Sequence, residues 1–226
     1  MSKRSVRRRT GVLTRVVALS AAVTAMFAGM QMGQPEEASA HGSATDPPSR
    51  NYGCWDRWAD NFQSPAMEEE DPMCWQAWQA NPNAMWNWNG LYVNGVNGNH
   101  ESAIPDGQLC SAGRDRYAAL DEPGQWKTVT KDNQFSVTIT DQAQHGADYY
   151  KVYITKQGFD PTTQRLGWDN LELVTETGSR PPATTTTIDN IDAGDRTGRH
   201  IVYTVWQASH MDQSYYFCSD VKFNGN

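Results

Sequence analysis

The second half of the chain alternates apolar and polar residues with a period of two, and this pattern restricts the fold more than any other feature. Three segments carry it, at 135–140, 150–155 and 201–206. β-branched and aromatic residues are frequent in all three, as is typical of half-buried β-strands. Clusters of turn-forming residues separate them, at 156–161, 178–182 and 192–198. We therefore predict a mainly β protein, an antiparallel β-sandwich of the immunoglobulin or fibronectin type III kind.

The stretch from about 49 to 124 is different, because it is rich in Trp, Asn, Gly, Pro and Met and has no strand alternation. Short helical turns are plausible around 73–79 and 114–120, and we expect ordered loop elsewhere in it. So long a loop inside one domain usually has a function. We expect it to form an insertion of loops and short helices after the first strand of the sandwich.

The first forty residues have the pattern of a signal peptide. Six basic residues precede an apolar stretch at 16–30, and the segment ends in Ala38-Ser39-Ala40, a small-x-small cleavage pattern. The apolar stretch is short and interrupted, so cleavage is a better interpretation than membrane anchoring. We predict a signal peptide at 1–40, a single domain at 41–226, and secretion; the arginines at 7–9 leave both the general and the twin-arginine export routes open.

Cleavage makes the chain strongly acidic. It leaves 13 Lys and Arg against 24 Asp and Glu, a net charge of −11. Nucleic acids and anionic membranes need a basic face, so we expect neither as a partner of the mature chain. A neutral polysaccharide meets no such objection.

Four cysteines in an exported chain indicate two disulfides. Three pairings are possible. We predict the bonds Cys54–Cys74 and Cys110–Cys218, and the pairing of Cys54 with Cys110 and Cys74 with Cys218 stays open as the alternative.

Cleavage would give His41 a special role, because a terminal histidine offers both its α-amine and its ring Nδ1. The amine has a pKa near 8, so it can bind a metal close to neutral pH. A second imidazole would complete a flat set of three nitrogens that suits Cu(II). We take His145, directly after the 135–140 strand, as that second ligand, with His210 as the competitor. His100 and His200 are interpreted as non-functional.

Several stretches make the chain resemble a known family, the bacterial lytic polysaccharide monooxygenases of auxiliary-activity class ten. They are His41-Gly-Ser-Ala-Thr-Asp-Pro-Pro-Ser-Arg, Asp71-Pro-Met-Cys-Trp, Met85-Trp-Asn-Trp-Asn-Gly, Pro105-Asp-Gly-Gln-Leu-Cys, Ala143-Gln-His145, Lys156-Gln-Gly-Phe-Asp-Pro, and Trp206 to Asp220. The resemblance covers essentially the whole mature chain. A signal site placed immediately before His-Gly is its most specific feature.

The resemblance implies roles for residues around a metal. His41 and His145 match the histidine brace that holds one copper ion. Ala143 matches a small residue that limits access to one axial position. Tyr215 matches the aromatic residue on the other axial side, which is often Phe in the family, with Tyr216 and Phe217 as neighbouring alternatives. Gln213 falls where the family has a carboxylate or amide near copper.

Two further residues match the face that binds substrate. Most of the nine tryptophans are expected in the core, Trp88 among them. Trp86 lies in an Asn- and Gly-rich segment without periodic apolar partners, so we expect it to be exposed and to stack on a sugar ring. It matches an exposed aromatic of the family, and Asn89 matches a polar position near the site. The acidic run 68–71 is interpreted as solvated surface and not as hydrolase carboxylates.

Together with this resemblance, the sequence predicts a secreted, monomeric, copper-dependent enzyme. It would take electrons from an external donor, use O2 or H2O2, and cleave crystalline cellulose, or chitin, by hydroxylation at C1 or C4. The alternatives are a non-catalytic carbohydrate-binding protein on the same sandwich, and a copper storage or delivery protein.

Overall fold

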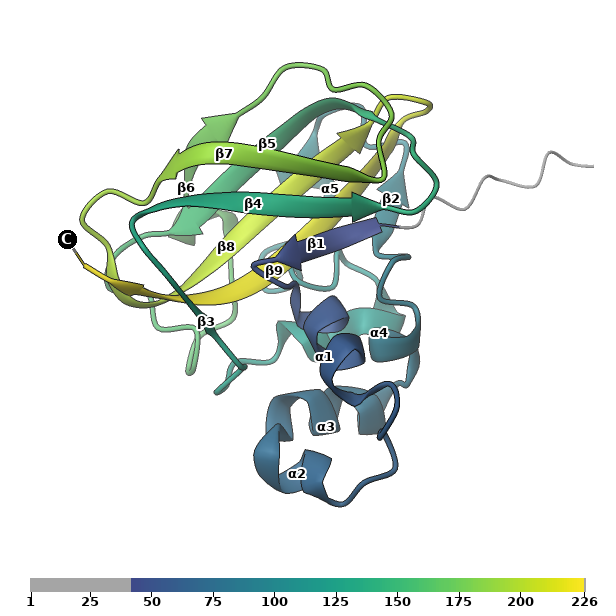
Figure 1. The fold of residues 1–226 in the computed structure, drawn as a ribbon, viewed down its shortest axis with the longest axis vertical. Coiled ribbons are helices and arrows are strands. Elements are labelled where there is room, and N and C mark those ends of the chain that lie inside the picture. Colours follow the sequence, from purple (N-terminus) through teal and green to yellow (C-terminus); the bar gives the residue numbers. More distant parts are fainter. Residues whose placement is uncertain (1–41, 226) are drawn as a thin grey trace, which may run out of the picture. The chain divides into compact units, whose positions relative to one another are not determined.

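Two β-sheets pack face to face in the computed structural model, which describes residues 42–225 (Figure 1). The smaller sheet has the order β1-β4-β7, with β1 at Gly42–Asp46, β4 at Gln134–Asp141 and β7 at Thr185–Asp192. The larger sheet has the order β2-β9-β8-β5-β6, and β3 also pairs with β9. Its strands are β2 (Tyr92–Asn94), β3 (Val129–Lys131), β5 (Ala147–Thr155), β6 (Leu171–Glu176), β8 (Thr197–Ala208) and β9 (Gln213–Asn224). All pairings except β3–β9 are antiparallel, so the predicted sandwich is confirmed.

Strand β8 differs from the half-buried strand that the sequence predicted. Its last nine residues are all buried, as are the first nine of β9. Alternate side chains enter two separate cores: Tyr203 and Val205 belong to one core, and Val202 and Trp206 to the other. The strand was predicted correctly, but its half burial was wrong because the segment before β3 covers the outer face of the large sheet.

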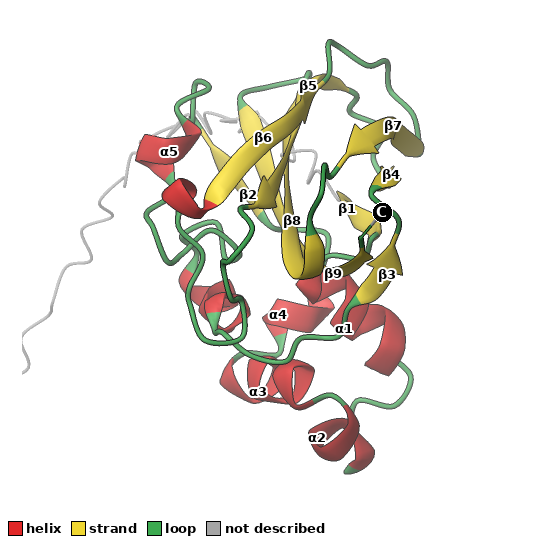
Figure 2. Ribbon diagram, turned by 90° about the vertical axis from the view of Figure 1, so that its left-hand side faces the viewer, coloured by secondary structure: helices red, strands yellow, loops and turns green. Residues whose placement is uncertain are grey.

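The insertion between β1 and β3 holds most of the helices and lies on one side of the sheets (Figure 2). Its helices are α1 (Arg50–Trp58), α2 (Ala66–Glu70), α3 (Pro72–Ala80), α4 (Asn83–Trp86), α5 (His100–Ala103) and the 3₁₀ helix η1 (Asp115–Asp121); a second 3₁₀ helix, η2 (Trp168–Asn170), precedes β6. The helical turns predicted around 73–79 and 114–120 are confirmed.

Helix α1 is a correction, because its residues were expected to be loop. Ser49 caps it, since its Oγ accepts a hydrogen bond from the Tyr52 amide at 3.2 Å. Arg50 then enters the protein and donates from Nε to Asp220 at 2.7 Å, with both side chains buried. Tertiary contacts of this kind stabilise a helix of nine residues, which would be marginal in isolation.

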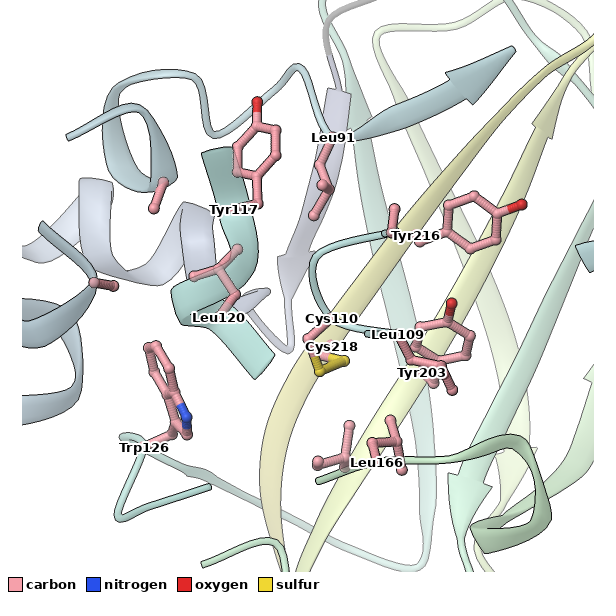
Figure 3. Packing of buried hydrophobic residues seen from close by; sticks show 14 of the residues in the cluster. Leu91, Leu109, Cys110, Tyr117, Leu120, Trp126, Leu166, Tyr203, Tyr216 and Cys218 are labelled. Carbon is pink, nitrogen blue, oxygen red and sulfur yellow. A yellow bond between two sulfur atoms is a disulfide. The ribbon is translucent and has the colours of Figure 1, made fainter. Parts of the chain in front are cut away.

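The two predicted disulfides are confirmed. Cys54 in α1 joins Cys74 in α3, and Cys110 in the insertion joins Cys218 in β9. Figure 3 shows the second bond among the buried side chains that lie between the insertion and β8 and β9, including Tyr203 and Tyr216. The bond therefore ties the insertion to the strand that it covers.

The acidic run 68–71 is only partly the solvated surface expected. Glu68, Glu69 and Glu70 are exposed, but Asp71 is buried and accepts hydrogen bonds from Arg57 and from the Trp58 indole. Within residues 42–225, no helix is both long and apolar enough to cross a membrane.

Candidate metal centre

The loop after β4 holds His145 through a single carboxylate, that of Asp141. One oxygen, Oδ2, accepts a hydrogen bond from the His145 amide at 2.5 Å. The other, Oδ1, accepts from the Ala143 amide and faces the His145 ring Nδ1, both at 3.1 Å. Asp141 and His145 are both buried, whereas Ala143 is exposed. The contact to Nδ1 leaves the ring Nε2 as the nitrogen able to bind a metal.

The backbone of this loop needs a glycine directly after His145. Gly146 has a φ of +69°, in the left-handed region that favours glycine. A Cβ there would also lie 2.8 Å from the Arg180 carbonyl oxygen. The Gly146 carbonyl accepts a hydrogen bond from the Trp206 indole at 2.9 Å, which joins the loop to β8.

Trp206 connects His145 to the aromatic residue predicted beside the metal. Its ring stacks on Tyr215 at a centroid distance of 4.4 Å and lies 6.4 Å from the His145 ring. Both Trp206 and Tyr215 have no exposed surface. Burial raises the pKa of Tyr215, so its phenol stays neutral at physiological pH.

The Tyr215 hydroxyl belongs to a short polar chain. It donates to Gln213 Oε1 at 2.9 Å, and Gln213 Nε2 donates to Asn94 Oδ1 at 3.0 Å. Gln213 therefore contacts Tyr215 directly, and the two residues follow one another on the same face of β9. Tyr216 points the other way, where its hydroxyl bonds His100, so it does not share the face of Tyr215.

The start of β1 lies against these groups. Gly42 is the register partner of Asp141 and donates its amide to the Asn89 carbonyl at 3.0 Å. A Cβ on Gly42 would lie 2.6 Å from Trp206 Cζ3, so the strand passes directly over the indole. The side chain of Asn89 donates to Gln142 Oε1 at 2.7 Å. Asn89 thus links the beginning of β1 to the loop that carries His145.

His210 lies beside His145, with ring centroids 4.0 Å apart, and its side chain is exposed on the turn between β8 and β9. Partial burial and the neighbouring His145 lower the pKa of His210. The His210 ring lies next to His145 on the solvent side.

Trp86 is 38% exposed, as predicted, whereas Trp88 is buried. Trp86 is the last residue of helix α4, which corrects the expectation that this segment is a loop. The ring is held edge-on by Phe62 and Trp78, at centroid distances of 5.1 and 5.9 Å. It is therefore a supported aromatic surface and not a free side chain.

The other two histidines lie elsewhere and have protein partners. His100 is buried, and its two ring nitrogens face the hydroxyls of Tyr216 and Tyr149 at 2.9 and 2.7 Å. His200 is buried beside Thr155. His41 lies outside the described residues, and within them no three His, Cys, Asp or Glu side chains are grouped as a metal site would require.

Comparison with known proteins gives the family. A family model described as lytic polysaccharide mono-oxygenase, cellulose-degrading, matches residues 41–221. The chain belongs to this family. The resemblance found in the sequence and the sandwich found in the structure agree with that membership.

Individual members are similar to different extents. The chitin-binding protein CbpD of Pseudomonas aeruginosa is 33% identical over 207 residues, which are 84% of this chain and 49% of the relative. The chain therefore spans about half the length of that relative. A lytic polysaccharide monooxygenase from Kitasatospora papulosa is 60% identical, with a TM-score of 0.80, over 82% of this chain and 100% of the solved one. CelS2, a cellulose-active member solved in complex with copper, is 26% identical, with a TM-score of 0.67, over 82% and 100% of the two chains.

The residues present here fit the metal centre of such a monooxygenase. Nδ1 of His145 is occupied by a carboxylate, the arrangement that commonly orients a metal-binding histidine. The sequence did not predict that the Asp141 carboxylate contacts His145, or that Trp206 packs between His145 and Tyr215. The available signal for Asp141 was its position, at the end of β4 and four residues before His145.

Proposed function

We propose that the chain, cleaved after Ala40, binds one copper ion through His41 and His145 and oxidatively cleaves crystalline polysaccharide. The observation that carries this proposal is the Asp141 contact to His145 Nδ1, which leaves Nε2 as the metal donor. His41 is joined directly to Gly42, and Gly42 is the register partner of Asp141. The chain connectivity is therefore compatible with both histidines serving one metal.

Copper is favoured by the chemistry of the donors. A terminal amine and two imidazoles make a set of three nitrogens, which prefers Cu(II) by geometry and by the general order of affinities. Bound copper would accept electrons from an external donor and use O2 or H2O2 to hydroxylate C1 or C4 beside a glycosidic bond. The zinc and copper complexes of similar monooxygenases support the presence of a metal centre.

The surrounding side chains would shape the space around that metal. Ala143 would lie beside the metal, and its methyl group would limit access to one side of it. Tyr215 would close the opposite side with a neutral ring, held in place by the Trp206 stack and by the hydrogen bond to Gln213. These residues act by position and by excluding water, and Tyr215 supplies no charge.

Trp86 and Asn89 would contact the substrate, cellulose first and chitin second. The exposed face of Trp86 suits the apolar C–H face of a sugar ring. Phe62 and Trp78 support the indole, so little side-chain freedom is lost on binding. Relatives named for chitin and for cellulose support both substrates.

Secretion and a monomeric state complete the proposal. The signal-peptide pattern at 1–40 supports secretion, and the two disulfides suit an oxidising compartment. Export would also create the terminal amine of His41, so processing would be part of assembling the site.

The test is mass spectrometry of soluble products from cellulose and from chitin, using copper-loaded mature protein and ascorbate. Aldonic acids or ketoaldoses are expected from at least one substrate. A non-catalytic carbohydrate-binding protein would bind the substrate and release neither product. A copper storage protein would bind copper without binding either polysaccharide.

A further inference from the structure

Asp141 is the one buried carboxylate of residues 42–225 whose ion-pair partner is a histidine. Asp220 and Asp71 each face an arginine, Arg50 and Arg57 respectively. Buried Asp121 accepts a backbone amide and has no ion-pair partner within 4.0 Å in that range. The one ion-pair partner of Asp141 in residues 42–225 is His145. Two backbone amides and this imidazole are its contacts, at 2.5 and 3.1 Å for the amides and 3.1 Å for the ring. A buried carboxylate is costly unless its oxygens are satisfied in this way.

We propose that Asp141 is a positioning residue that holds His145 in the tautomer with the proton on Nδ1 and sets its distance from the start of β1. The proposal rests on the proposed function, in which His145 is a metal ligand. A carboxylate can only accept a hydrogen bond, so a neutral imidazole at 3.1 Å must present Nδ1–H to it. The lone pair of Nε2 is then free before any metal arrives.

The same residue fixes the imidazole in space. The Asp141 backbone pairs with Gly42 in the small sheet, and its side chain holds the amides of Ala143 and His145. One residue therefore connects the strand that follows His41 to the loop that carries His145. Asp141 would therefore set the separation between the start of β1 and His145 before a metal binds.

A cation on Nε2 would also balance the buried charge. The Nδ1–H hydrogen bond to Asp141 makes the ring more basic and so a better ligand at Nε2, as outer carboxylates do for metal-bound histidines. Removing such a partner typically weakens metal binding by about 10- to 100-fold. The Asp141 side chain would thus strengthen metal binding through His145, without being a ligand itself.

Asp141→Asn separates positioning from general stability. When the Asn oxygen accepts from the His145 amide, its NH2 group faces His145 Nδ1 and donates to it, which forces the proton onto Nε2 and leaves the Ala143 amide without this acceptor. The matched control is Asp121→Asn, because Asp121 is also buried and accepts a backbone amide, that of Ser111 at 2.9 Å. Both variants replace a buried carboxylate by a neutral amide, and only the Asp141 side chain faces His145.

The experiment uses the mature protein and two measurements. ¹⁵N NMR of the metal-free protein should show His145 protonated on Nδ1 in the wild type and in Asp121→Asn, and on Nε2 in Asp141→Asn. Calorimetric titration with Cu(II) should show affinity weakened about 10- to 100-fold in Asp141→Asn alone. The Cu(II) electron paramagnetic resonance spectrum should change in that variant too.

Two results would overturn the proposal. The first is wild-type His145 protonated on Nε2, a measurement that needs no variant to fold. The second is Asp141→Asn with unchanged tautomer and copper affinity. Failure of the proposed function is a separate outcome, because His145→Ala would then bind copper as tightly as the wild type, whatever tautomer His145 shows.

Discussion

Gly42→Ala is the substitution whose effect the structure defines most directly. The added Cβ would lie 2.6 Å from Trp206 Cζ3 and 2.7 Å from the Thr140 carbonyl oxygen, both far inside van der Waals contact. Trp206 cannot retreat easily, because it stacks on Tyr215 at 4.4 Å and its indole N–H is bonded to Gly146. The strand β1 must therefore move, or the clash must be absorbed by the core.

Overpacking of this kind costs about 1–3 kcal/mol. For a domain of this size each kcal/mol lowers the melting temperature by roughly 2–4 °C, so a decrease of about 2–12 °C is expected. Differential scanning calorimetry of the metal-free protein measures it, and copper titration should show weaker binding because Gly42 directly follows His41 in the chain. Gly178→Ala is the control, since nothing lies within 4 Å of its added Cβ. A melting temperature in Gly42→Ala equal to that of Gly178→Ala would refute the account of β1 and Trp206.

Three other predictions concern separate parts of the molecule. Arg50→Met leaves Asp220 buried without its partner and should reduce the free energy of unfolding in urea by about 3–5 kcal/mol, whereas Arg57→Met should cost less because the Arg57 side chain is 33% exposed. Burial, and then the charge of Lys151, lowers the pKa of His100 to about 4. The unfolded chain takes up this proton first, so the contribution of His100, on the order of 3 kcal/mol, should be present above pH 6.5 and lost as the pH falls towards 4. Urea titrations from pH 7 to pH 4 should show that loss in the wild type and not in His100→Gln. Trp86→Ala should weaken binding to cellulose by about tenfold in a pull-down assay and leave copper affinity unchanged; equal binding by both proteins would remove Trp86 from the substrate face.

The sequence predicted the fold where burial follows a simple period. Strand β4 alternates buried and half-buried residues, so the segment 135–140 was recognisable. Strand β9 is buried on both faces and has no such period. Helix α1 depends on Ser49 and on the distant Asp220, and a local pattern contains only the first of these.

In the candidate site, too, some features were predictable from the sequence and others depend on the fold. His145, Ala143 and Tyr215 belong to recognisable motifs, so the sequence could propose them. The Asp141 contacts depend on how the loop turns back, and the Trp206 stack depends on the register that pairs Trp206 with Tyr215. Asn89 was proposed for the substrate face, and the structure adds its hydrogen bonds to Gly42 and Gln142. None of these contacts is encoded by spacing alone.

The central claim is that the terminal amine of His41 and the ring of His145 hold one copper ion. The most direct measurement compares the Cu(II) affinity of the mature protein, beginning at His41, with that of the same protein carrying one extra alanine before His41. The extra residue turns the amine into an amide that cannot chelate in the same way. We expect tight binding of one copper ion by the mature protein and its loss in the extended one. Equal affinity in both proteins would contradict the claim.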